Sequence, residues 1–163
     1  MRDKRKASIF LVLIVAAVVA LDQWTKSLVK ANLAVGESIA PLPLLGDFFR
    51  ILHWKNTGAA FGIFQDSNLI LTVLSVLIIG VLVWYYFTVE EGQQLLQFGL
   101  ALAVGGAIGN LIDRVSQGYV TDFLSFGTFP IFNVGDSAVT VSVGLMILAV
   151  LLDSKKHKPE LED

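Results

Sequence analysis

The chain has no cysteine and only two histidines, His53 and His157. The absence of cysteine excludes thiol catalysis, disulfide bonds and cysteine-based zinc or iron–sulfur sites. Because one of the two histidines lies in a polar tail, we also expect no histidine-based zinc site. The sequence therefore predicts a protein that works without a bound metal or cofactor.

Charged side chains are scarce as well. They make up 16% of the 163 residues, and hydrophobic residues make up 55%, with a mean hydropathy of +0.70. A soluble domain has about 25% charged residues, so this composition predicts a single integral membrane domain. The net charge of −2 is small and argues against nucleic acid as a partner.

Four apolar stretches are long enough to cross a bilayer, which takes about 20 residues of helix. The expected helices cover about residues 7–28, 67–89, 92–112 and 131–152. Basic residues precede the first stretch, as in a signal peptide, but no Ala-x-Ala site follows it. We interpret this stretch as an uncleaved anchor and the chain as an α-helical membrane protein with four transmembrane helices.

The distribution of basic residues predicts how the helices are oriented. Four of them precede the first helix, and this cluster favours a cytoplasmic N-terminus. Four crossings then place the tail, residues 153–163, on the same side, and residues 32–66 outside. In that outer segment Pro41 and Pro43 exclude a long helix, and residues 48–54 are typical of a short strand.

Asp122 and Asp136 are the only charged residues between positions 115 and 152. An ionised acid in or near a membrane is costly and is a functional candidate by default. The two acids are predicted to lie near one membrane face, where they could form a pair that shares one proton. The alternative is a loop acid and a first-turn acid that complements the helix dipole, with Asn133 as the helix cap.

Three further groups of residues stand out, and two of them are interpreted as structural. Gly105 and Gly109, four residues apart, permit close helix contact, and we interpret them as structural. Asn110 and Arg114 share a neighbouring face of the same helix. In the functional alternative both residues hold a substrate backbone. In the structural alternative Asn110 makes an interhelical hydrogen bond and Arg114 forms a capping pair with Asp113. The spacing leaves both alternatives open. In addition, Asp22 and Lys26 have the i,i+4 spacing of a structural ion pair.

Five motifs in this order resemble the bacterial lipoprotein signal peptidases (signal peptidase II). The resemblance covers essentially the whole chain. This chain departs from the family pattern at Gly135, where the family usually has alanine. The motifs are Asp22-Gln23-x-x-Lys26, Asn56-x-Gly58-Ala59-Ala60-Phe61, Gly105-Gly106-Ala107-x-Gly109-Asn110-x-x-Asp113-Arg114, Gly118-x-Val120-x-Asp122-Phe123 and Phe132-Asn133-x-x-Asp136.

The resemblance implies an aspartic peptidase of the bacterial cell membrane. Its substrates are prolipoproteins whose cysteine carries a diacylglyceryl group, and it cuts before that cysteine. Family members have four transmembrane helices, a small extracytoplasmic β-cradle and a short outer helix, and globomycin inhibits them. Asp122 and Asp136 match the catalytic acids. The positions that contact substrate or support the acids are matched by Asn56, Asn110, Arg114 and Asn133.

Two other classes of function are alternatives to the peptidase. A small transporter would use Asp22, Asp122 and Asp136 as a proton relay, but these acids cluster near one face and the chain lacks broken-helix repeats. A non-catalytic scaffold would use only the glycine stripe. We therefore expect a monomeric peptidase embedded in membrane lipid, with both termini cytoplasmic and the active site near the extracytoplasmic face.

Overall fold

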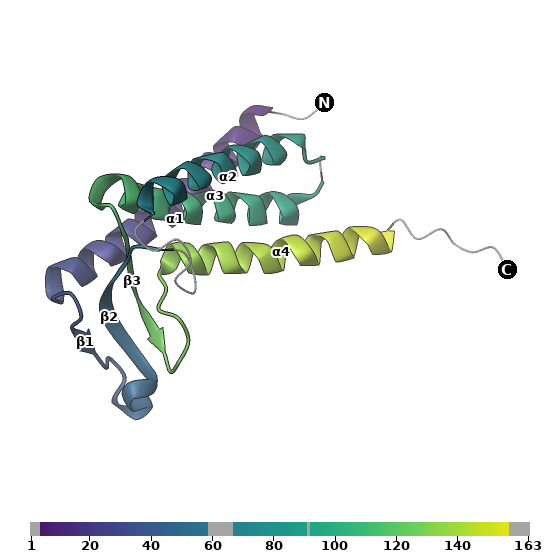
Figure 1. Cartoon of the computed structure of the whole chain (residues 1–163). Helices are drawn as coiled ribbons and strands as arrows, with labels where there is room; N and C mark the ends of the chain where they lie inside the picture. Colours follow the sequence, from purple (N-terminus) through teal and green to yellow (C-terminus); the bar gives the residue numbers. More distant parts are fainter. Residues whose placement is uncertain (1–3, 59–66, 91, 157–163) are drawn as a thin grey trace.

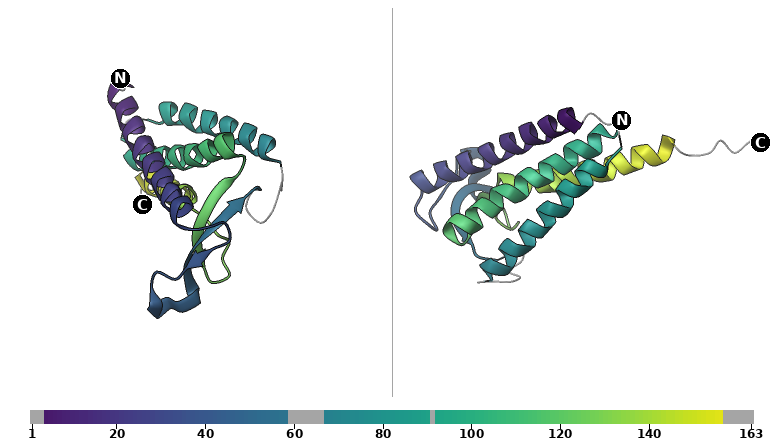
Figure 2. Two further views of the ribbon diagram at one scale, coloured as in Figure 1. Left: turned by 90° about the vertical axis from the view of Figure 1, so that its left-hand side faces the viewer. Right: turned by 90° about the horizontal axis from the view of Figure 1, so that it is seen from above.

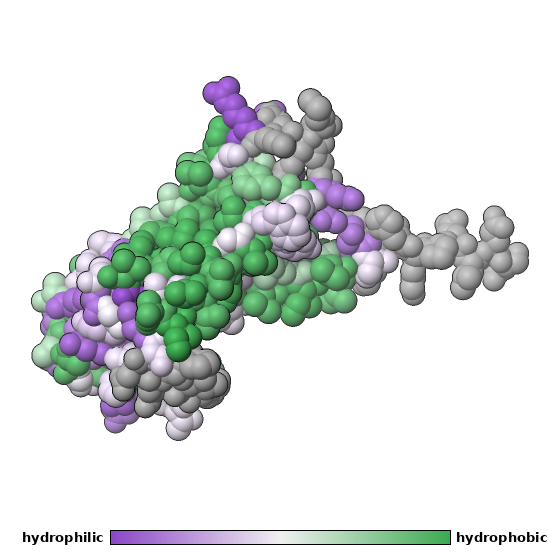
Figure 3. Space-filling model, turned by 45° about the horizontal axis from the view of Figure 1, so that its top comes forward, coloured by the Kyte–Doolittle hydropathy of each residue, from purple (hydrophilic) through white to green (hydrophobic). Residues whose placement is uncertain are grey.

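The computed structural model describes residues 4–58, 67–90 and 92–156. Within these ranges four helices are long and apolar enough to cross a membrane (Figure 1). Their apolar side chains cover the middle of the molecule, and hydrophilic ones gather toward its two ends (Figure 3). The structure thus confirms the expected fold class. The helices are α1 (Lys4–Asn32), α2 (Asn68–Thr88), α3 (Gln94–Gln117) and α4 (Val134–Lys156).

Helix α3 is the centre of the bundle and packs against each of the other three (Figure 2). Its small residues let the neighbouring backbones come close. A Cβ added at Gly105 would lie 2.8 Å from Cβ of Val18 in α1, and one added at Gly106 would overlap the carbonyl oxygen of Gly135 in α4. Because lipid tails are as apolar as leucine, close packing of this kind has to hold the helices together.

A three-stranded antiparallel sheet lies at one end of the bundle, in the order β1-β2-β3. Strands β1 (Ser38–Ile39) and β2 (Phe49–Asn56) come from the segment between α1 and α2, and η1, a 3-10 helix (Pro43–Phe48), joins them. The third strand, β3 (Val120–Phe126), lies between α3 and α4 and is not among the elements that the sequence predicts. The second half of the motif at Asn56, residues 59–61, lies outside the described residues.

Several helix boundaries differ by a few residues from those that the sequence predicts, and two of these differences bear on the site. Helix α3 continues past residue 112 to Gln117 and ends at Gly118, whose φ of 83° is the left-handed conformation that stops helices. Helix α4 begins at Val134 and not at residue 131, because Phe132 forms a bridge with Leu124 of the sheet. Asn133 then caps the helix, as predicted: its Oδ1 accepts the backbone N–H of Asp136 at 2.9 Å.

A buried ion cluster holds α1 and α3 together. The Lys26 side chain is 0% exposed, and its Nζ lies 2.7 Å from Oδ2 of Asp22 and 3.2 Å from Oδ2 of Asp113. Its third partner is Oδ1 of Asn110 at 2.9 Å. The pairing with Asp22 was expected from the i,i+4 spacing. Asp113, considered above as a capping partner of Arg114, instead pairs with the lysine.

The two acids of this cluster also hold the backbone of β3 and α4. Oδ1 of Asp22 accepts the N–H of Gly135 at 2.8 Å, and Oδ2 of Asp113 accepts the N–H of Thr121 at 2.9 Å. Gln23 donates to Oδ1 of Asp113 at 3.1 Å. Buried charges are tolerated when they are paired and hydrogen-bonded in this way. The cluster therefore links α1, α3, β3 and the first turn of α4.

Replacing Lys26 by methionine is expected to destabilise the protein strongly. The substitution leaves Asp22 and Asp113 buried without their cation, which costs about 3–5 kcal/mol of unfolding free energy. Lys30→Met is the control. Among the described residues this exposed lysine of the same helix makes one long side-chain hydrogen bond, of 3.4 Å to Gln117, so its loss is expected to change the unfolding free energy by about 0.5 kcal/mol or less. Thermal unfolding midpoints in detergent micelles measure both; equal midpoints would contradict a structural role of the cluster.

Adding one methyl group at the contact between α3 and α4 is also expected to destabilise the bundle. Gly106→Ala forces a Cβ against the Gly135 carbonyl, and such overpacking costs about 1–3 kcal/mol. Gly80→Ala is the matched control in α2, because nothing lies within 4 Å of the Cβ added there. The same unfolding measurement should show a loss for Gly106→Ala only, and an equal effect of both variants would rule out the close contact.

Candidate active site

Asp122 and Asp136 come from different elements and meet at Asn133. Asp122 lies in β3, and Asp136 lies in the first turn of α4. The side-chain Nδ2 of Asn133 donates to Oδ1 of Asp122 at 2.6 Å, and its backbone N–H donates to Oδ2 of Asp136 at 3.2 Å. One residue thus holds both carboxylates, and the structure brings together the two acids that the sequence singled out.

Local structure explains why each acid sits where it does. Asn133 and Asp136 bond each other reciprocally, each through its side chain to the backbone N–H of the other, in the pattern of a capping box. Asp136 therefore lies at the helix N-terminus, where the dipole favours an anion. Asp122 is fixed by the pairing of β2 with β3, in which it lies opposite Trp54.

Two further amides complete the surroundings of the carboxylates. Asn56 donates from Nδ2 to Oδ2 of Asp122 at 2.8 Å, and Asn110 donates from Nδ2 to Oδ1 of Asp136 at 2.8 Å. Each carboxylate therefore receives an N–H group at both of its oxygens. All of these donors are neutral, so none of them forces either acid to stay ionised, as a direct ion pair would.

The amide oxygens of the same asparagines are bonded within the protein as well. Oδ1 of Asn56 accepts the N–H of Gly58 at 3.0 Å. Oδ1 of Asn110 accepts from both Lys26 and Asn133, at 2.9 Å and 3.0 Å. Asn110 thus makes the interhelical hydrogen bond of the structural alternative, between α3 and Lys26 of α1.

Arg114 differs from the asparagines in how it faces the site. It lies in the last turn of α3, is half-buried, and lines the same cavity as Asp122 and Asp136. Its guanidinium lies within the electric field of both carboxylates. Its backbone is held by Asn68 of α2, which donates to the Arg114 carbonyl at 3.1 Å. Arg114 therefore presents a cation to whatever occupies the cavity.

The surroundings of Asp122 favour its protonated form. Burial of the carboxyl group raises the pKa of Asp122 to about 7, and the charge of Asp136 adds to this effect. The hydrogen bonds from Asn56 and Asn133 to the carboxylate act in the opposite direction. A carboxyl group with this pKa can hold or release a proton near neutral pH.

A cavity of about 1030 Å³ opens in front of the two acids. Asn56, Asn110 and Arg114 lie on its polar part together with the acids, and apolar side chains form much of the rest. Sequence reasoning missed this apolar lining, because the residues come from segments that do not follow one another in the chain. The apolar residues are Trp54, Val120, Phe129, Pro130, Ile131, Phe132, Val139 and Val141.

The remaining candidate residues lie behind the cavity. Lys26 and Asp22 are fully buried, and Gly105 and Gly109 face α1. Asp113 joins this layer and was not selected as a site residue, although it stands inside one of the motifs quoted above. Within the described ranges, no group of three or more His, Cys, Asp or Glu side chains is arranged to hold a metal ion.

Comparisons with known proteins agree on one family. A family model described as "Signal peptidase (SPase) II" matches residues 14–152. The lipoprotein signal peptidase of Shouchella clausii is 42% identical over 142 residues, covering 86% of this chain and 92% of that protein. The one from Brevibacillus brevis is 42% identical over 149 residues, covering 90% and 97%.

Solved structures give the same answer at the level of the fold. One described as a bacterial membrane enzyme at 2.3 Å resolution has a TM-score of 0.81 at 34% identity and covers 94% of each chain. A second, at 1.9 Å resolution, has a TM-score of 0.75 at 35% identity and covers 87% of this chain and 92% of the other. Sequence and structure together show that this chain belongs to the signal peptidase II family.

Proposed function

We propose that this member of the signal peptidase II family, a multi-pass membrane protease, is an aspartic peptidase in which Asp122 and Asp136 form the catalytic dyad. It cuts prolipoproteins before a cysteine that carries a diacylglyceryl group. The observation that carries the proposal is the bonding of both carboxylates to Asn133 at the wall of one cavity. The similarity to the lipoprotein signal peptidases of Shouchella clausii and Brevibacillus brevis also supports it.

The surroundings of the two acids support different roles for them. Asp122, with its pKa raised to about 7, is the member that carries the proton. Asp136 is the anion, because it lies at the N-terminus of α4 and accepts N–H groups from Asn110 and Asn133. Two close carboxylates share one proton at neutral pH, which is the state that an acid–base pair needs.

In the proposed reaction Asp136 takes a proton from a water molecule, and the resulting hydroxide attacks the scissile carbonyl carbon. Asp122 gives its proton to the carbonyl oxygen, which forms a neutral tetrahedral intermediate. The C–N bond then breaks while Asp136 returns its proton to the leaving nitrogen, and Asp122 recovers a proton from the collapsing hydroxyl group. The step uses one water and needs neither a covalent intermediate nor a metal.

The cavity supports a substrate that is part peptide and part lipid. Arg114 offers N–H donors to peptide carbonyls, while apolar side chains such as Phe129, Ile131 and Val141 offer a surface for acyl chains. By the family resemblance, globomycin-type inhibitors would occupy the same cavity. One chain supplies all of these residues, so the proposed site needs no second copy to complete it, and we propose that the enzyme works as a monomer.

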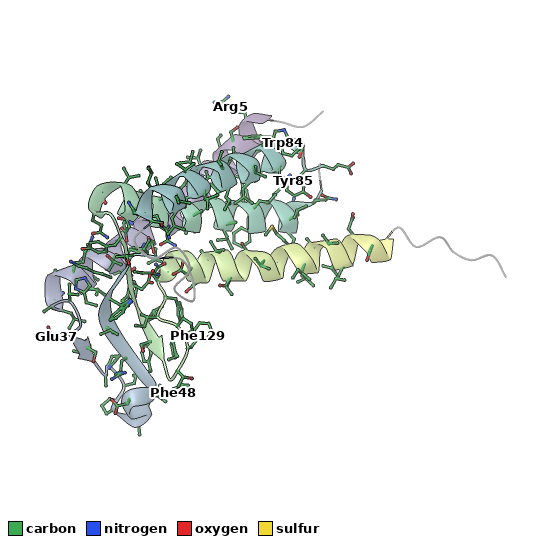
Figure 4. The ribbon with its side chains drawn as sticks, in the orientation of Figure 1. Arg5, Glu37, Phe48, Trp84, Tyr85 and Phe129 are labelled. Atoms are coloured by element: carbon green, nitrogen blue, oxygen red, sulfur yellow. The ribbon has the colours of Figure 1, made fainter. Side chains whose placement is uncertain are left out.

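We place both termini in the cytoplasm and the active site near the extracytoplasmic face. Arg5 lies at the end of the bundle away from the sheet, as do Trp84 and Tyr85 (Figure 4). Basic residues favour the cytoplasmic side, and tryptophan and tyrosine favour a membrane interface. The sheet and the acids at its edge then face outward.

Replacing either acid by its amide is expected to stop cleavage without unfolding the protein. Asp122→Asn and Asp136→Asn keep the shape of the side chain but lose the acid–base function, so kcat should fall by about 10³-fold or more. Cleavage of a diacylglyceryl-modified precursor in detergent measures this effect. Asp47→Asn, at a highly exposed position in η1, is the control and should keep full activity. Substantial cleavage by either dyad variant would disprove the dyad.

The activity is expected to decline as the pH rises through neutrality. Below pH 7 Asp122 is protonated and can act as the acid; above it the proton is lost and both carboxylates carry charge. The value of kcat/KM should then fall by about tenfold per pH unit on the alkaline side. The apparent pKa belongs to the pair of acids. Circular dichroism at each pH serves as the folding control, and a constant kcat/KM from pH 6 to pH 9 would contradict the assigned roles.

A further inference from the structure

The end of the sheet that lies farthest from the helices carries a group of exposed apolar side chains. Leu44 is fully exposed, Leu42 is 50% exposed and Phe48 is 60% exposed, and Phe129 of the β3–α4 connection is 63% exposed. Together with Leu45 we call these residues the apolar tip. Apart from Phe129, none of them lines the cavity in front of the acids. The proposed reaction therefore does not explain why they are apolar.

The direction of the sheet places this tip beside the membrane-spanning helices. Strands β2 and β3 run across the helix axes, so the sheet extends sideways from one end of the bundle (Figures 1 and 2). Helices that span a membrane stand roughly along its normal. The sheet consequently lies roughly parallel to the membrane surface, and the tip reaches beyond the edge of the bundle, over lipid.

The chain around the apolar tip carries no net charge. Residues 41–50 contain the charged side chains Asp47 and Arg50, which pair at 3.9 Å. Glu37, by contrast, lies at the other edge of the sheet from Phe129: it comes just before β1, whereas Phe129 follows β3 (Figure 4). A group of exposed apolar side chains without net charge, beside the ends of membrane-spanning helices, is typical of a segment that lies in a membrane interface.

Internal contacts hold the tip in place. The N–H of Gly127 donates to the carbonyl of Phe48 at 2.7 Å, which connects η1 to the end of β3. The ring of Phe126 stacks on Phe49, with a centroid distance of 4.7 Å, and contacts Phe48 edge-on at 6.3 Å. Leu44 and Phe48 are therefore displayed on a supported scaffold, so little conformational freedom is lost when they meet another surface.

We propose that the apolar tip is a membrane anchor that inserts into the interface of the lipid leaflet next to α4. Its partner is the lipid surface itself, because the tip extends sideways from one end of a bundle of membrane-spanning helices and its apolar side chains are exposed. Transfer of leucine and phenylalanine side chains from water into the interface is favourable. The anchor fixes the tilt of the sheet, and with it the depth at which the cavity opens beside α4.

The absence of native cysteine permits a direct test with single spin labels. Leu44→Cys and the control Glu37→Cys are each labelled with a nitroxide, and the protein is placed in lipid nanodiscs at one enzyme per disc. Power saturation then compares collisions with oxygen, which dissolves in lipid, and with a water-soluble nickel chelate. We expect the ratio of oxygen to nickel collisions to be several-fold higher at position 44 than at position 37.

Two outcomes would overturn the anchor. One is equal exposure of positions 44 and 37 to nickel. The other is dipolar broadening between labels at position 44 when the labelled protein is reconstituted in liposomes, where two copies can meet; this would make a second copy of the chain the partner. Leu44→Asp provides a check without a label: kcat/KM on substrate in bilayers should fall several-fold, while the value in micelles stays unchanged. Unchanged activity in bilayers would also overturn it. The label measurement needs no catalysis, so it separates failure of the anchor from failure of the proposed function.

Discussion

The buried charge of Lys26 is the constraint on which the rest of the site depends. Its two acidic partners each accept the backbone N–H of the residue before one of the proposed catalytic acids. Asp113 accepts the N–H of Thr121 at 2.9 Å, and Asp22 accepts the N–H of Gly135 at 2.8 Å. The lysine therefore positions Asp122 and Asp136 without touching either of them. If the cation were lost, the two acids behind the site would repel each other, and β3 and α4 would lose their common support.

The arrangement separates a buried ion-paired cluster from the two acids for which we propose a shared proton. Lys26 satisfies Asp22 and Asp113 directly, and its third bond goes to the neutral amide of Asn110. That amide then donates to Asp136 at 2.8 Å. The charge of the lysine thus acts on Asp136, a member of the proposed dyad, through a polarised amide. A direct ion pair would instead keep a carboxylate ionised.

Part of this structure follows from local sequence and part does not. The apolar runs predict the helices, the i,i+4 spacing predicts the pair of Asp22 and Lys26, and Asn133 three residues before Asp136 predicts the cap. Strand β3 was not predicted because its first four residues are all buried. It therefore lacks the alternation of apolar and polar residues by which a half-buried strand is recognised. The role of Asp113 depends on a partner in another helix, which spacing within α3 cannot reveal.

The glycines of α3 connect the packing of the bundle to its chemistry. Gly106 meets Gly135 where α3 and α4 cross, Asn110 lies one turn further along α3, and Asp136 follows Gly135 directly. The close backbone contact therefore sets the distance over which Asn110 bonds Asp136. In lipid no hydrophobic force drives helices together, so small residues and polar bonds must act jointly. The same contact that holds α4 in the bundle consequently places its acid within reach of Asn110.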